Sequence, residues 1–201
     1  MKVYMLIDQS GSMATNWAET VGAVNSYVKK MTSDKPKKLR LNVAAFDADS
    51  GLNFTELRRD VKIKDWTDIT NDDATPRGST PLFDAIGKLC TWIDVDKPDR
   101  ALIAIITDGH ENSSREVSKD AAKAMLDKFR EKKFDIVFIG ADFDAFGQAA
   151  TLGNARGQTL NMSPGNYAAA SASLASRTTA YAASGAVMDW SDEDRKAASE
   201  K

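Results

Sequence analysis

The sequence contains few of the residues that form covalent cross-links or titrate near neutral pH. Among its 201 residues there is one cysteine, Cys90, and one histidine, His110. A lone cysteine cannot form an intramolecular disulfide, which excludes a disulfide-stabilised fold. We expect Cys90 to be a buried thiol within a helix rather than a nucleophile, because free cysteine is among the most buried residue types.

Long apolar runs and an excess of one charge are also missing. No stretch approaches the roughly 18 consecutive apolar residues of a transmembrane helix, and the first residues show no signal-peptide pattern, so we expect a cytoplasmic protein. The 27 basic and 29 acidic residues give a net charge of −2. That balance gives no electrostatic reason to expect a nucleic acid or a membrane as partner. The basic residues at 29–30 and 35–38 form a local cluster, which is interpreted as a solvated helix end and loop.

Apolar and charged residues are present in the proportions of an ordinary globular domain, 42% and 28%. No internal repeat or linker is evident, so we expect one domain over residues 1–186 and a polar tail over 187–201 that frays. Apolar runs typical of strands alternate with patterns typical of helices. The expected strands are 3–7, 39–46, 53–57, 61–63, 101–106, 134–140 and 158–162, and the expected helices are 14–31, 81–93, 116–133, 142–152 and 166–184. This alternation predicts an α/β fold with a mostly parallel sheet covered on both faces.

The most informative motif follows the first expected strand. Asp8-Gln9-Ser10-Gly11-Ser12 places a carboxylate and two hydroxyls between that strand and a helix. The carboxyl ends of parallel strands are where open α/β sheets bind ligands. Clustered hard oxygen ligands suit a small hard cation such as Mg²⁺.

Two later segments place further oxygen ligands at comparable positions. Thr80 lies between Gly78, which allows a tight turn, and Pro81, which suits the first turn of a helix. Asp108 follows the apolar run 101–106, which is typical of a buried parallel strand. These side chains can converge with the first motif if the two strands are neighbours in the sheet.

The combination resembles the von Willebrand factor A domain, over residues 1 to about 162. The metal-ion-dependent adhesion site of that family consists of Asp-x-Ser-x-Ser, a distant Thr and a distant Asp. The matching residues in this chain are Asp8, Ser10, Ser12, Thr80 and Asp108. The resemblance implies a Rossmann-like three-layer sandwich with one antiparallel edge strand. It also implies that these residues bind Mg²⁺, with Mn²⁺ or Ca²⁺ as alternatives.

The resemblance further implies a non-catalytic module in which the ion bridges to an acidic side chain of a partner protein. Small bacterial and phage members of the family often act beside an AAA+ ATPase, and some are virion proteins. If this chain is encoded by a phage, the resemblance implies that it is associated with the virion. The residues expected to form the partner-binding rim are Gln9, Met13, Trp17, Arg77, His110, Glu111 and Asn112.

Three alternatives remain open at this point. A metal-dependent hydrolase or phosphatase would use Asp8 and Asp108 and would need a lysine nearby, such as Lys88 or Lys123. His110 could be a metal ligand instead of a rim residue, although Mg²⁺ prefers oxygen. The Ala- and Ser-rich helix 166–184 either completes the fold or faces a partner. The sequence contains no phosphate-binding glycine loop and no recognisable catalytic triad.

Overall fold

The computed structural model describes residues 1–34, 39–141, 145–187 and 189–199. Its centre is a six-stranded sheet in the order β3-β2-β1-β4-β5-β6. The strands are β1 (Lys2–Asp8), β2 (Arg40–Ala48), β3 (Leu52–Lys62), β4 (Ala101–Thr107), β5 (Asp135–Ala141) and β6 (Thr159–Met162). Neighbouring strands are parallel except for β2 and β3, which pair antiparallel at one edge. The predicted sheet is therefore confirmed.

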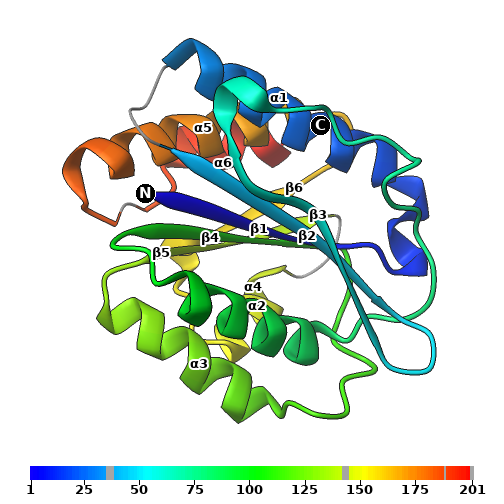
Figure 1. Cartoon of the computed structure of the whole chain (residues 1–201). Coiled ribbons are helices and arrows are strands. Elements are labelled where there is room, and N and C mark those ends of the chain that lie inside the picture. The colour runs from blue at the N-terminus through cyan, green and yellow to red at the C-terminus, as the bar shows by residue number, and fades with distance from the viewer. Residues whose placement is uncertain (35–38, 142–144, 188, 200–201) are drawn as a thin grey trace.

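Helices cover both faces of this sheet, which makes the molecule a three-layer α/β sandwich as predicted (Figure 1). One face carries α1, α5 and α6, and the other carries α2, α3 and α4. The helices are α1 (Trp17–Asp34), α2 (Leu82–Asp96), α3 (Lys119–Glu131), α4 (Ala145–Thr151), α5 (Tyr167–Ser184) and α6 (Asp192–Ser199). Short 3₁₀ turns are η1 (Gly11–Thr15), η2 (Ile63–Asp65) and η3 (Arg156–Gln158).

The central strands are buried on both sides, as their apolar sequences predict. In β1, Val3 and Met5 belong to the core beneath α1 and α5, whereas Tyr4 and Leu6 belong to the opposite core. All residues of β4 are buried. Side chains alternate across a strand, so a strand covered on both faces is apolar at successive positions. None of the helices in the described ranges has the length and apolar character needed to cross a bilayer.

The expectation for Cys90 is confirmed. Its side chain lies in α2 and is 4% exposed. Burial raises the pKa of the thiol to about 12, which keeps it protonated and unreactive at neutral pH.

Helix α5 completes the fold by packing against α1 and the sheet. Tyr167, Leu174 and Tyr181 are buried in the same core as α1. Arg177 of α5 forms two hydrogen bonds of 2.8 Å with the carboxylate of Asp135, at the start of β5, and both side chains are buried. Of the two roles left open for this helix, the structure shows packing within the fold.

Two local expectations differ from the structure, and two others lie outside the residues that it describes. The predicted edge strands 53–57 and 61–63 form one strand, β3, because a shift in register opposite Val43 lets pairing with β2 continue. Helix α3 begins after Ser118, whose side chain accepts a hydrogen bond from the backbone N–H of Ala121, and not at 116. The expected start of a helix at 142 and the basic residues at 35–38 lie outside the described residues.

The C-terminal segment also differs from expectation. Residues 187–201 were expected to fray, yet Asp192–Ser199 form helix α6, which packs beside α5 and β6. Trp190 is 5% exposed, and the guanidinium of Arg177 lies 4.8 Å from the centroid of its ring. The backbone N–H of Ser163 donates to the carbonyl of Ala198 at 3.0 Å. A few apolar contacts on either side of the polar helix α6 hold this segment against the domain. The domain boundary predicted at 186 stays a prediction.

Candidate metal centre

The carboxyl ends of β1 and β4 lie next to each other in the sheet. Their parallel register pairs Ile7 with Ile106, so Asp8 at the end of β1 is level with the end of β4, and Asp108 follows β4 directly. The neighbouring arrangement that the sequence prediction required is therefore present.

A chain of hydrogen bonds connects the residues of the first motif to Asp108. The Oδ1 oxygen of Asp8 accepts the backbone N–H of Ser10 at 2.8 Å. The hydroxyls of Ser10 and Ser12 lie 3.1 Å apart, and Ser12 donates to Oδ1 of Asp108 at 2.7 Å. Both carboxylates and both serine hydroxyls thus belong to one cluster.

Thr80 reaches the same cluster from the turn before α2. It is 2% exposed. A Cβ atom placed on Gly109 would lie 3.5 Å from Oγ1 of Thr80 and 3.6 Å from Oγ of Ser12, so both hydroxyls flank the same backbone position. The structure therefore brings together all the residues predicted to bind the ion.

Close backbone contacts hold the turn that carries Thr80. Gly78 has a φ of +65°, and a Cβ there would lie 2.1 Å from the carbonyl oxygen of Ala48. Its own carbonyl accepts the N–H of Gly11 at 3.0 Å, and Ser79 and Ala48 exchange two backbone hydrogen bonds. Only glycine permits this combination of conformation and approach.

The two carboxylates are difficult to ionise in this environment. Burial raises the pKa of Asp8 to about 6, hydrogen bonds from Thr107 and Ser10 partly oppose the shift, and the charge of Asp108 adds to it. Burial also raises the pKa of Asp108. A divalent cation between them would favour both ionised forms, because opposite charge lowers the pKa of a carboxyl.

The donor set consists of two carboxylates and three hydroxyls. Across the ranges that the structure describes, no three His, Cys, Asp or Glu side chains are grouped so that they could hold a metal ion. His110 is exposed, and its Nδ1 atom lies 3.2 Å from Oε1 of Gln148. An all-oxygen set with few negative charges suits Mg²⁺ or Mn²⁺ that retains water ligands.

Two residues that support this cluster and its flanking loop were not predicted from the sequence. Thr107 donates to Oδ2 of Asp8 at 2.5 Å and accepts the N–H of Gly109 at 3.2 Å. Asp47, fully buried at the end of β2, accepts hydrogen bonds from the side chains of Gln9 and Arg77. The sequence places both residues at strand ends. Their hydrogen-bond partners lie on other strands and loops, however, and no local pattern predicts them.

The predicted rim is only partly at the surface. Gln9, Met13 and Trp17 are 2%, 0% and 4% exposed, which corrects their expected place on a partner-facing rim. The turn η1 directs Met13 into the core instead of toward solvent. The other rim residues are exposed or half-buried, namely Arg77, His110, Glu111 and Asn112. Their role in partner binding stays a prediction.

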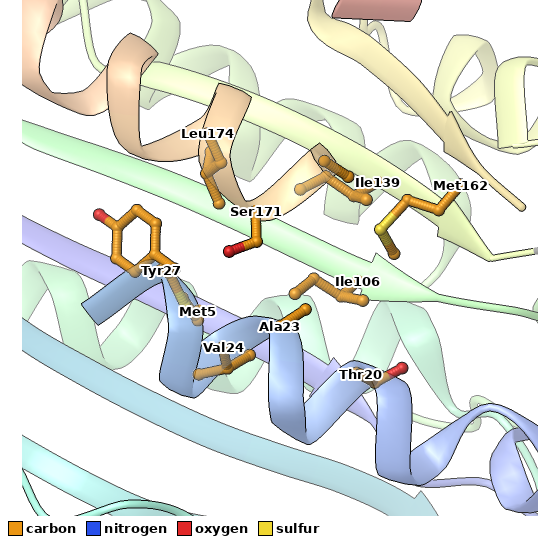
Figure 2. Close-up of a pocket in the computed structure, with 11 residues that line it drawn as sticks. Met5, Thr20, Ala23, Val24, Tyr27, Ile106, Ile139, Met162, Ser171 and Leu174 are labelled. Carbon is orange, nitrogen blue, oxygen red and sulfur yellow. The ribbon is translucent and has the colours of Figure 1, made fainter. Parts of the chain in front are cut away.

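A small cavity lies between α1, α5 and the sheet, and no residue of the cluster lines it (Figure 2). Its lining is mostly apolar, with Met5, Val24 and Ile106 among the side chains that point into it. None of the lining residues carries a formal charge. The cavity therefore offers an ion no ligands comparable to those at the strand ends.

Comparison with known families identifies the domain that carries this cluster. The family model of the von Willebrand factor type A domain matches residues 2–175. The chain belongs to this family. A comparison of this type A domain with curated proteins finds no significant match.

Solved structures share the fold of this type A domain at low sequence identity. The manganese-loaded TRAP protein of Plasmodium vivax has a TM-score of 0.61 and 19% identity, with 84% of this chain and 70% of that chain covered. The vWF domain of the type V pili tip protein Mfa5 from Porphyromonas gingivalis has a TM-score of 0.69 and 14% identity, covering 94% and 98%. The pilus adhesin SpaC from Lactobacillus rhamnosus GG, in an open conformation, has a TM-score of 0.68 and 8% identity, covering 90% and 30%.

Proposed function

We propose that this type A domain is a divalent-metal-dependent protein-binding module. The observation that carries the proposal is the cluster of Asp8, Ser10, Ser12, Thr80 and Asp108 at the carboxyl ends of β1 and β4. The likeness to a manganese-loaded structure and to pilus proteins supports the same function.

In this proposal, the hydroxyls of Ser10, Ser12 and Thr80 are direct ligands of Mg²⁺. Asp8 and Asp108 act directly or through water and balance the charge of the ion. When bound, Mg²⁺ supplies a coordination position for a carboxylate of the partner. Ser12 is exposed and Asp108 is half-buried, so a partner would reach the cluster from their side.

One exposed cation near the cluster, Arg77, supports an acidic partner. The side chain of Arg77 is 63% exposed, and Nε of its guanidinium lies 3.3 Å from Oδ2 of Asp47. A guanidinium held in this way can still direct other N–H groups toward a carboxylate. An AAA+ ATPase or a component of a bacterial or phage assembly is the partner class that we propose. We also propose a cytoplasmic or virion-associated location.

The alternative of a hydrolase or phosphatase receives less support. Oδ1 of Asp8, the candidate nucleophile, accepts the N–H of Ser10, and Oδ2 accepts the hydroxyl of Thr107, so the chain itself orients both oxygens. Lys123, considered as the lysine for phosphoryl transfer, pairs with Asp127 on its own helix at 2.5 Å. Neither contact favours catalysis at this cluster.

The test has two readouts, metal binding and partner capture. Mn²⁺ binding is measured by the electron paramagnetic resonance signal of the free ion, for the wild type, Asp8→Asn and the control Asp68→Asn, an exposed acid outside the cluster. We expect binding to the wild type and the control and its loss in Asp8→Asn. Equal binding by all three proteins, or by none, contradicts the proposal.

The second readout is a pull-down from host lysate with the same proteins, each in Mg²⁺ and in EDTA. We expect a protein that is retained by the wild type and by Asp68→Asn in Mg²⁺ only. Retention in every lane would mean that partner binding does not involve the ion. Hydrolysis of a generic phosphomonoester that is lost in Asp8→Asn would favour the enzyme alternative.

A further inference from the structure

The backbone of Thr80 is held from both sides by a single residue of another loop. Its N–H donates to Oδ1 of Asn112 at 2.9 Å, and its carbonyl accepts the N–H of Asn112 at 3.1 Å. The two residues are 32 positions apart in the chain. Asn112 therefore connects the loop after β4, which begins with Asp108, to the turn that carries Thr80.

The loop that contains Asn112 is itself attached to the start of α2. Both oxygens of Glu111 accept hydrogen bonds, Oε1 from the N–H of Ser114 at 2.6 Å and Oε2 from the N–H of Phe83 at 3.0 Å. Asp84, in the first turn of α2, accepts the N–H of Val117 at 2.7 Å. Glu111 thus connects the loop after β4 to the first turn of α2, and Asp84 of α2 connects back to the end of that loop. These bonds fix the loop and, with it, the position of Asn112.

A threonine ligand depends on such support more than a carboxylate does. A neutral hydroxyl is attracted only weakly by an ion that is not yet in contact with it. Its contribution to metal affinity therefore depends on its being oriented before the ion binds. Residues that orient metal ligands typically change metal affinity by about 10- to 100-fold when they are replaced. The orientation of Thr80 depends on its backbone, because its side chain is fixed to that backbone by one rotatable bond.

We propose that Asn112 is a positioning residue for the ion, acting through the backbone of Thr80, and not primarily a contact for the partner. This inference rests on the proposed metal-binding function. It assigns Asn112 a different role from its neighbours on the predicted rim. The side-chain acceptor is the part of Asn112 that a substitution can remove, whereas its backbone N–H remains.

The test compares four variants with the wild type by their affinity for Mn²⁺ and their melting temperature in EDTA. Asn112→Ala removes the acceptor, and Asn112→Gln moves it by one methylene group. Asn112→Asp keeps an acceptor at the same place. Ser113→Ala is the matched control, because the hydroxyl of Ser113 is buried and has no hydrogen-bond partner among the described residues.

We expect the Kd for Mn²⁺ to rise at least about tenfold in Asn112→Ala and Asn112→Gln. Ser113→Ala should bind Mn²⁺ as tightly as the wild type does. Asn112→Asp should bind it as tightly or, because aspartate adds a negative charge, more tightly. The melting temperature of Asn112→Ala in EDTA should fall by no more than about 4 °C, the effect of one lost hydrogen bond in a chain of this size. If Asn112→Ala does not fold, the comparison of Asn112→Gln with Asn112→Asp decides.

Two outcomes would overturn the inference and can be told apart. A wild type that does not bind Mn²⁺ removes the proposed metal function and this inference with it. A wild type that binds, together with unchanged affinity in Asn112→Ala and Asn112→Gln, removes only the positioning role. If those variants then lose partner capture, Asn112 belongs to the partner surface instead.

Discussion

The hydroxyl of Thr107 donates a hydrogen bond of 2.5 Å to the carboxylate of Asp8, and this bond joins the end of β4 to the end of β1. The other oxygen of Asp8 accepts the N–H of Ser10. Both oxygens of this buried carboxylate are therefore oriented by the chain itself. The bond also lowers the pKa of Asp8, in opposition to the larger effect of burial.

Thr107→Val keeps the shape of the side chain and removes the donor to Asp8. We expect the free energy of unfolding in EDTA to fall by about 1–3 kcal/mol, because a buried acceptor loses its partner. Chemical denaturation measures this change. Thr107→Ser retains the donor and should lose clearly less. A loss in Thr107→Val no larger than the loss in Thr107→Ser would contradict the role of the hydrogen bond.

Divalent metal should raise the melting temperature of this protein. An ion that binds only the folded state stabilises it in proportion to the logarithm of ion concentration over Kd. We expect Mg²⁺ to raise the melting temperature relative to EDTA, and Asp108→Ala to abolish the increase. Asp68→Ala, which removes an exposed acid elsewhere, should respond as the wild type does. A response that survives in Asp108→Ala contradicts the role of that residue.

The effect of metal on stability should depend on pH. The pKa of Asp8 is raised from 3.8 to about 6, so the metal-free folded chain holds this proton more tightly than the unfolded chain does. This group stabilises the metal-free fold most below its unfolded pKa, and that contribution is lost as pH rises through about 6. Mg²⁺ must displace the same proton, so we expect a larger metal-induced increase in melting temperature at about pH 7.5 than at about pH 5.

Thermal melts at the two pH values, each in Mg²⁺ and in EDTA, measure this difference. Asp8→Asn serves as the control, because its side chain does not titrate. In EDTA it should lose the part of the pH dependence that Asp8 contributes. An increase with Mg²⁺ that is the same at both pH values would contradict the linkage to Asp8.

Gly78→Ala should be far more costly than an alanine at another turn glycine. Gly78 has a φ of +65°, and an added Cβ would lie 2.1 Å from the carbonyl oxygen of Ala48. We expect a loss of at least about 2 kcal/mol in the free energy of unfolding, from strain and from displacement of the backbone. Gly51→Ala, where a Cβ would meet no atom within 4 Å, should change stability by about 0.5 kcal/mol or less. Similar effects at both positions would contradict this reading of the turn.

Much of the fold was predictable because its signals are local. The apolar run 101–106 predicted a buried parallel strand, and β4 is that strand, buried at every position. Asp8 and Asp108 were predicted at strand ends from the residues beside them. The convergence of these acids was also predictable, given two neighbouring parallel strands, and the register of β1 with β4 confirms it.

Other features depended on contacts that leave no local pattern. The continuity of β3 depends on a shift in its register with β2, and α6 depends on burial of Trp190 and Ala198 against distant elements. Met13 and Trp17 were expected on the rim, but the turn η1 places Met13 in the core and the first turn of α1 places Trp17 there. Hydrophobic periodicity describes which side of an element is apolar and not what covers it.

The order of residues alone was enough to predict the layered α/β fold and the oxygen-bearing side chains at the ends of two strands, because short segments determine strand burial and strand-end polarity. The three-dimensional packing was needed to show which residues hold those ligands in place. Thr107 reaches Asp8 from another strand, and Asn112 holds Thr80 across 32 residues of chain. These hydrogen-bond partners depend on how the loops fold over the edge of the sheet. That arrangement is a property of the whole fold and cannot be predicted from a short segment.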